Sequence, residues 1–208
     1  VVGQQPAGGL QTVFFDDFNA ATLSANWIRS NPGLAGLVGD ASFWFGNNHL
    51  ALRNSANDVM TVPIDLSGVR AAVVSMDVLR GLDYLFSENP DPGEDFYVQF
   101  LDVNGVWQNL EGFPGSGTPG EHYVRSGASA YTLNTTAFHA GFRLRVLFVG
   151  GSGFNFDWWH VDNVRIEKVG TDAPFLFNIS NAISTSPTLS GATLLPNSLK
   201  VNGLALDG

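Results

Sequence analysis

The sequence predicts an all-β protein, an antiparallel β-sandwich, on three observations. Aromatic residues make up 12% of the 208 residues and charged residues only 14%, and aromatic side chains favour strands. The 24 glycines provide for many turns. No stretch keeps a helical period of apolar residues beyond a turn or two, so short strands joined by turns are expected to form two packed sheets.

The first expected strands are short runs of aromatic and β-branched residues. Residues 12–15 (TVFF) form the first of them and lead into an acidic pair. Residues 28–39 are rich in Gly, Pro and Asn and are expected to be a loop. Residues 42–45 (SFWF) and 49–53 (HLALR) are separated by Gly-Asn-Asn, which predicts a hairpin. A further short strand, 59–62 (VMTV), ends at a proline.

The middle of the chain gives clearer patterns. Residues 71–79 are nearly all apolar, interrupted by Ser75 and Asp77, as in a central strand covered on both faces. Residues 96–100 alternate in polarity and are followed by Asn-Gly before 106–107. That dipeptide predicts a hairpin with a type I′ turn.

The last strands lie between flexible, Gly-rich stretches. Residues 123–124 and 130–133 are short strand-like pieces, and 142–148 alternates apolar residues with two arginines, as in a half-exposed strand. The closing strand, 157–166, has a change of phase at Asp162. Its inward positions are Trp159, Val161, Val164 and Ile166. Such a slip predicts a β-bulge, which re-aims a side chain, so that Asp162 is either a metal ligand or hydrogen-bonded to a neighbouring loop.

Composition divides the chain into three regions. Residues 1–11 are small and Gly-rich, so a flexible leader is expected, and 12–168 hold the sandwich. Composition changes again in 169–208, where a linker precedes short strand-like pieces. About 35 residues are too few for a complete immunoglobulin-like sandwich. They are expected to be either the first strands of a following domain or strands that pair with another chain.

Charge and cysteine content exclude several classes of function. The formal net charge is −9, with lysine only at Lys168 and Lys200, which argues against nucleic acid as a partner. The chain has no cysteine, so disulfides and thiolate sites are impossible. No run approaches the roughly 18 apolar residues of a membrane helix, and no membrane insertion is expected. The chain begins with Val1 rather than Met, which is consistent with a removed signal peptide or a shortened chain.

Three pieces of sequence resemble a known family by their order and spacing. They are Phe15-Asp16-Asp17-Phe18 with Trp27 downstream, then 94–100 followed by 104–107, and finally 159–166. Together they resemble bacterial MAM-like jelly-roll domains, which are related in plan to reelin subrepeats and to calcium-containing carbohydrate-binding modules. The resemblance covers about residues 14–167 and is more specific for the fold than for a ligand.

The resemblance implies a jelly roll whose first and last strands are adjacent, with a structural calcium ion between them. The positions that match the family's calcium ligands are Asp16 or Asp17 on the first strand and Asp162 on the last. Calcium takes about six to eight oxygen ligands, so backbone carbonyls or waters would complete the shell. A hydrogen-bonded corner without an ion is the alternative.

The sequence gives little support for a catalytic site. The four histidines lie on separate segments without metal-ligand spacing, and ordinary strand or surface positions are expected for them. Glu88, Asp91, Glu94 and Asp95 cluster in one Pro-containing loop. Glycoside hydrolysis requires two carboxylates that face each other across the bond, so this loop is expected to be solvated or cation-binding, and the chain is predicted not to be an enzyme.

Two functions remain open. The first is a non-catalytic adhesion or assembly module of a secreted or cell-surface protein, which would contact other copies of itself or neighbouring domains and be stabilised by calcium. The alternative is a carbohydrate-binding module that targets an attached enzyme to glycans. For that alternative, Trp44 and Trp158 are the candidates for exposed sugar-stacking rings, although burial is the favoured interpretation for each ring.

Overall fold

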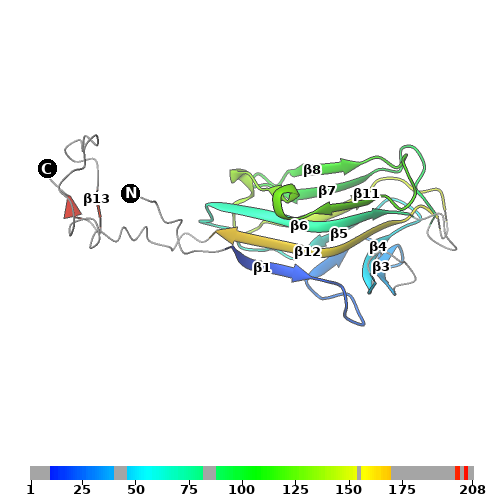
Figure 1. The fold of residues 1–208 in the computed structure, drawn as a ribbon, viewed down its shortest axis with the longest axis horizontal. Coiled ribbons are helices and arrows are strands. Elements are labelled where there is room, and N and C mark those ends of the chain that lie inside the picture. Colours follow the sequence, from blue (N-terminus) through cyan, green and yellow to red (C-terminus); the bar gives the residue numbers. More distant parts are fainter. Residues whose placement is uncertain are drawn as a thin grey trace, which may run out of the picture. The chain divides into compact units, whose positions relative to one another are not determined.

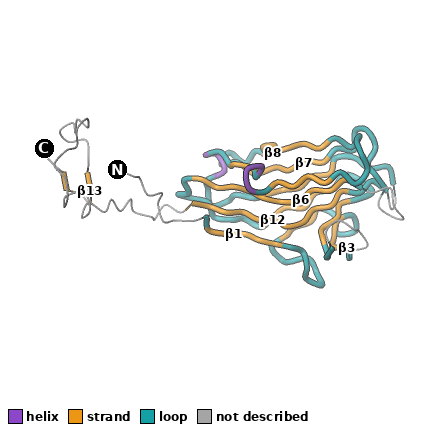
Figure 2. Tube along the Cα trace, viewed as in Figure 1, coloured by secondary structure: helices purple, strands orange, loops and turns teal. Residues whose placement is uncertain are grey.

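The computed structural model describes residues 10–39, 46–81, 88–153 and 156–169, together with 200–201 and 204–205. Within Val1–Ala173 the described residues form two antiparallel β-sheets that pack face to face (Figure 1). Helical structure in this part is confined to short 3-10 turns at Gly127–Ser129 and Thr135–Ala137 (Figure 2). The predicted all-β jelly-roll sandwich is confirmed.

The larger sheet is built around two long strands, β6 (Ala71–Arg80) and β12 (Trp159–Val169), which pair with each other (Figure 1). Short strands flank this pair. On the β12 side they are β1 (Gln11–Asp16), β4 (His49–Leu52) and β3 (Ala35–Val38), and on the β6 side β9 (His122–Arg125) and β10 (Tyr131–Thr132). Because β1 pairs with β12, the first and last strands of the sandwich are adjacent, as the resemblance implies.

The smaller sheet has five strands. Their order is β2 (Trp27–Arg29), β5 (Asn57–Thr61), β11 (Leu144–Phe148), β7 (Phe96–Leu101) and β8 (Trp107–Phe113). The predicted hairpin is confirmed, since β7 pairs with β8. Its turn is not type I′, because that turn needs a positive φ at both central residues and Asn104 has none, while Gly105 has φ 75°. Instead, Asp102 Oδ1 accepts hydrogen bonds from the Asn104 and Val106 backbone N–H groups.

The core lies between the sheets, where every second residue of each strand points inward and meets those of the other sheet. Trp159 of β12 is completely buried and stacks on Phe96 of β7, with ring centroids 5.2 Å apart. Its Nε1 donates to the Glu94 carbonyl oxygen at 3.1 Å, so that the indole is both packed and satisfied. At the edge of the core, Phe14 meets Trp27 edge-on at 5.2 Å.

The prediction of a loop over residues 28–39 is wrong. The stretch contains most of β2 and all of β3, and β3 pairs with β4 from Ala35 opposite Leu52 to Val38 opposite His49. Its Ala-Gly-Leu-Val sequence has weak strand propensity, but pairing and burial in context override propensity. The expected hairpin partner of β4, residues 42–45, lies outside the described residues.

The C-terminal residues form a separate unit, Pro174–Gly208. In it β13 (Lys200–Val201) pairs with β14 (Leu204–Ala205), which agrees with a strand-like extension. The predicted leader lies outside the described residues except for its last two positions, and β1 begins at Gln11, one residue before the expected start of the sandwich. The described residues contain no helix long and apolar enough to cross a membrane.

Candidate functional site

The predicted bulge in the closing strand is confirmed. Asp162 of β12 lies opposite Asp77 of β6, and the next pair is Arg165 with Ser75, so β12 has one extra residue in between. Asn163 takes up the extra length with φ 53°, a left-handed conformation that Asn adopts more easily than most residues. The bulge turns neighbouring polar side chains of β12 toward the outer face of the larger sheet.

Asp162 is buried at this bulge, with 1% of its surface exposed. Its Oδ1 accepts a hydrogen bond from the Asn163 backbone N–H at 2.7 Å, and the Asn47 side chain also bonds to it. Burial, together with the smaller effect of the negative charges of Asp77 and Asp17, raises the pKa of the carboxyl to about 6. The charged form of Asp162 is therefore unfavourable here unless a cation lies close to it.

The two acidic residues at the end of β1 have different surroundings. Both oxygens of Asp16 accept hydrogen bonds at 2.8 Å, one from the Phe18 backbone N–H and one from Trp27 Nε1. Asp17 accepts from the Asn19 backbone N–H at 3.2 Å, and hydrogen bonds from Asn19 lower the pKa of Asp17. The charge of Asp17 contributes to the raised pKa of Asp162, whereas both oxygens of Asp16 are used in hydrogen bonds, so Asp17 fits a shared cation site better than Asp16.

The donor set suits a hard cation in chemistry but is incomplete. Asp17, Asp77 and Asp162 supply carboxylate oxygens, and Asn47 an amide oxygen, which are ligand types that calcium prefers. However, the described residues contain no group of three or more His, Asp or Glu side chains arranged to hold a metal ion. Calcium binding therefore stays a prediction. Asp77 and Asn47 are not among the ligands expected from the sequence, although Asp77 interrupts the apolar run of β6.

One of the two candidate sugar-stacking tryptophans, Trp158, lies in the described part of the chain, and its ring is buried. Trp158 is 5% exposed, His160 stacks on it at 5.7 Å between centroids, and the Arg53 guanidinium lies 4.5 Å from its ring centroid. Trp158 is therefore buried, in agreement with the favoured interpretation, and its ring is used for packing rather than exposed to a sugar. Trp44 lies outside the described residues.

The fold brings together two histidines that are 111 residues apart. His49 Nε2 lies 2.9 Å from His160 Nδ1, and the two residues are 1% and 3% exposed. Burial lowers the pKa of His160 well below its usual value, and the charge of a protonated His49 would lower it further. His160 is thus held neutral inside the protein. The local sequence gave no signal for this contact, because it arises only when β4 and β12, which are distant in the chain, pair in the sheet.

The acidic loop before β7 is not simply solvated. Glu94 is 9% exposed, and its Oε2 accepts the Asp91 backbone N–H at 2.7 Å. Burial raises the pKa of Glu94, and the neighbouring carboxyls of Asp157 and Asp91 contribute to the rise. Asp95 accepts hydrogen bonds from the Gly115 N–H and the Tyr97 hydroxyl. These contacts tie the loop to the rest of the sandwich.

Comparison with solved structures finds similar folds. The K3 cleaved adhesin domain of Lys-gingipain from Porphyromonas gingivalis W83 has a TM-score of 0.52 and 16% identity, covering 76% of this chain and 99% of that one. The K1 cleaved adhesin domain of the same protein has a TM-score of 0.51 and 12% identity, covering 75% and 97%. A xylan-binding domain from CBM 22 has a TM-score of only 0.46 at 13% identity, covering 77% and 96%. No family model matches the chain, and no curated protein matches its sequence. At these identities the similarity shows that the chain has the β-sandwich fold of the two adhesin domains.

Proposed function

We propose that the chain is a non-catalytic adhesion or assembly module of an extracellular or cell-surface protein. The observation that carries the proposal is that its sandwich is similar to two cleaved adhesin domains over nearly their whole lengths, 99% and 97%. In the same fold, polar groups that an enzyme would need are used for structure. His160 packs between Trp158 and His49, and Glu94 caps its own loop.

The proposed module acts by contacting other copies of itself or neighbouring domains of a longer surface protein. Its larger sheet ends in edge strands whose outer backbone groups have no ladder partner among the described strands, such as β1 and β3. Such edges accept a further strand from another chain. The β13–β14 hairpin of the C-terminal unit adds strand-forming sequence beyond the sandwich.

The proposal includes calcium as a stabilising ion between the first and last strands. The support is the buried Asp162, whose carboxyl lies near the negative charges of Asp17 and Asp77. A cation bound there would offset their repulsion and would fasten β1 and β12 together. An ion that binds only the folded state raises its stability according to the ion's concentration and affinity.

Sedimentation velocity at increasing protein concentration tests the assembly function. The chain of 208 residues would be measured in calcium and in chelator, and its largest species imaged by negative-stain electron microscopy. We expect species larger than the 22.3 kDa monomer whose proportion increases with concentration. A protein that stays monomeric at every concentration in both conditions would overturn the assembly proposal.

A further inference from the structure

A groove of about 430 Å³ runs over the outer face of the larger sheet, within the size range of sites for small ligands. Its floor is formed by β6 and β12, with β1 on one side and β9 with the turn that follows it on the other. The side chains that matter for its chemistry are Phe15, Ser75, Asp77, Val124, Asn163 and Arg165. It lies outside the core, and Trp158 is not among its lining residues.

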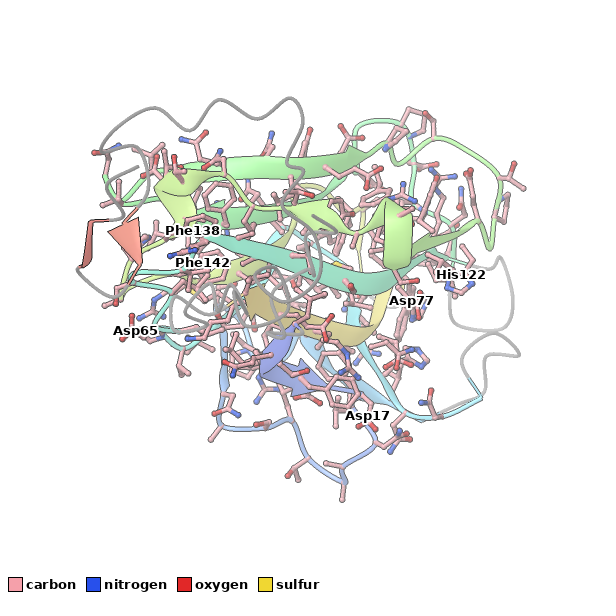
Figure 3. All side chains as sticks on the ribbon, turned by 60° about the vertical axis from the view of Figure 1, so that its left-hand side comes forward. Asp17, Asp65, Asp77, His122, Phe138 and Phe142 are labelled. Carbon is pink, nitrogen blue, oxygen red and sulfur yellow. The ribbon has the colours of Figure 1, made fainter. Side chains whose placement is uncertain are left out.

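The bulge of β12 gives the groove its polar floor. Asn163, exposed and left-handed, extends its amide across to β6, where Nδ2 donates to Asp77 Oδ2 at 2.9 Å. The side chain of Asp77 is 17% exposed, and its Oδ1 lies 3.7 Å from His122 Nε2 on β9 (Figure 3). The amide oxygen of Asn163 and the remaining lone pairs of Asp77 are therefore fixed in position at the surface.

Apolar side chains stand on the two sides of this floor. Phe15 on β1 and Val124 on β9 are each 47% exposed, and Val124 lies directly opposite Asp77 in the sheet. Arg165, the cross-strand partner of Phe15, places its guanidinium 4.3 Å from the centroid of the Phe15 ring. This stacking limits the motion of both side chains, so the groove is a formed surface with an apolar rim and a polar floor.

The groove's chemistry favours a ligand rich in hydroxyl groups and without strong charge. Two carboxylates, Asp77 and Glu167, and one guanidinium, Arg165, give the lining a small net negative charge, which disfavours an acidic ligand. Carboxylate and amide oxygens accept hydrogen bonds, while the guanidinium and the Ser75 hydroxyl donate them. A hydroxyl group does both. The strands of the floor are already paired, with β12 bonded on both sides, so an extended peptide cannot add to the sheet here.

We propose that this groove binds a neutral oligosaccharide, whose sugar rings lie against Phe15 and Val124 while ring hydroxyls bond to Asp77 and Asn163. The inference names a ligand class for the adhesion module and to that extent rests on the proposed function. It places the ligand on β1, β6, β9 and β12, away from Trp158. Adhesion would then include contact with a glycan-bearing surface.

Calorimetric titration of the full chain with defined oligosaccharides tests the groove. The probes are cellohexaose, xylohexaose and laminarihexaose, which are neutral, and hexagalacturonate, which is acidic. Phe15→Ala removes the exposed ring, and Asn163→Gly removes the floor amide while keeping a residue that accepts a positive φ. Ile28→Ala is the matched control, because Ile28 is an exposed apolar residue (41%) on the smaller sheet.

We expect at least one neutral oligosaccharide to bind, with affinity reduced about tenfold or more by Phe15→Ala and by Asn163→Gly, and unchanged by Ile28→Ala. Melting curves of the variants report whether each one is folded. Failure of all three neutral probes, tighter binding of hexagalacturonate, or equal binding by Phe15→Ala and the unmodified chain would overturn the groove assignment. Sedimentation of the same samples separates this outcome from failure of the proposed function. If they still assemble as concentration rises, the assembly function stands even though the groove assignment has failed.

Discussion

Replacing Asp162 by Asn tests whether the buried negative charge at the bulge lowers the stability of the folded protein. The amide has nearly the same shape, and its oxygen can still accept the Asn163 N–H that Asp162 Oδ1 accepts now. The substitution removes the buried negative charge that lies near Asp77 and Asp17. In the absence of calcium, Asp162→Asn should therefore make the folded protein more stable, which is the opposite of the usual effect of a substitution at a buried residue.

The pKa of Asp162 sets the upper limit of this gain. A change from 3.8 to about 6 corresponds to about 3 kcal/mol, since each pKa unit is worth about 1.4 kcal/mol. Partial screening by solvent reduces the expected gain to about 1–2 kcal/mol. For a domain of this size that is a rise in melting temperature of about 3–6 °C. The raised pKa also means that the unmodified protein becomes more stable as pH falls from about 6 toward 3.8, and the variant should lose that contribution.

The assay is thermal unfolding at neutral pH, in chelator and in calcium, with Asp65→Asn as control. Asp65 is exposed at the surface (Figure 3), and the amide oxygen of Asn can still accept the Ser67 backbone N–H that Asp65 Oδ1 accepts now, so its substitution should change both curves much less than Asp162→Asn does. In chelator, Asp162→Asn should melt above the unmodified chain. In calcium, the unmodified chain should gain stability and the variant should not. An unchanged or lower melting temperature in chelator would refute the account of the buried charge, and a calcium-induced rise that persists in the variant would refute the proposed metal site.

Three other substitutions have expected outcomes. Glu94→Gln keeps an acceptor for the Asp91 N–H but removes a buried charge beside Asp157. Because the pKa of Glu94 is raised in the folded state, ionisation of Glu94 lowers the stability of the unmodified protein as pH rises above the carboxyl's unfolded pKa. Urea unfolding at neutral pH should therefore give the variant a free energy of unfolding about 1 kcal/mol higher, and a lower value would contradict this. Trp159→Ala should cost about 3–5 kcal/mol by leaving a cavity beside Phe96, and a urea midpoint close to that of the unmodified chain would contradict it. Glu111→Ala removes the acceptor of Arg125 and of the Tyr131 hydroxyl and should cost about 1–3 kcal/mol, whereas an unchanged midpoint would show that this contact between the sheets is not stabilising.

An element of the fold could be predicted from the sequence where the residues of a single strand show a clear two-residue period. The change of phase at Asp162 predicted the bulge because the two-residue period of β12 is clear on each side of it. β3 could not be predicted in the same way. Its four residues contain a glycine and no aromatic residue, and its pairing with β4 is a property of the whole sheet that the local sequence does not contain.

The candidate site could be predicted only in part, since its members come from distant segments. The resemblance selected Asp162 with either Asp16 or Asp17, but Asp77 enters the site because β6 pairs with β12 in one particular register. The contact between His49 and His160 and the closeness of Glu94 to Asp157 have the same origin. The burial of Trp158 could not be decided from the sequence for a different reason, because the residues next to a tryptophan do not tell whether its ring packs in the protein or is exposed at the surface.

The position of β12 in the larger sheet has a consequence for how the protein is made. β12 bonds to β1, β4 and β6, yet it is the last strand of the sandwich to leave the ribosome. Until then, three earlier strands lack their shared neighbour, and the pairing of Phe14 with Ile166 spans most of the domain, which slows folding. A nascent chain that stops before Asp157 should therefore remain unfolded. The sandwich would thus fold only after its whole length has been synthesised.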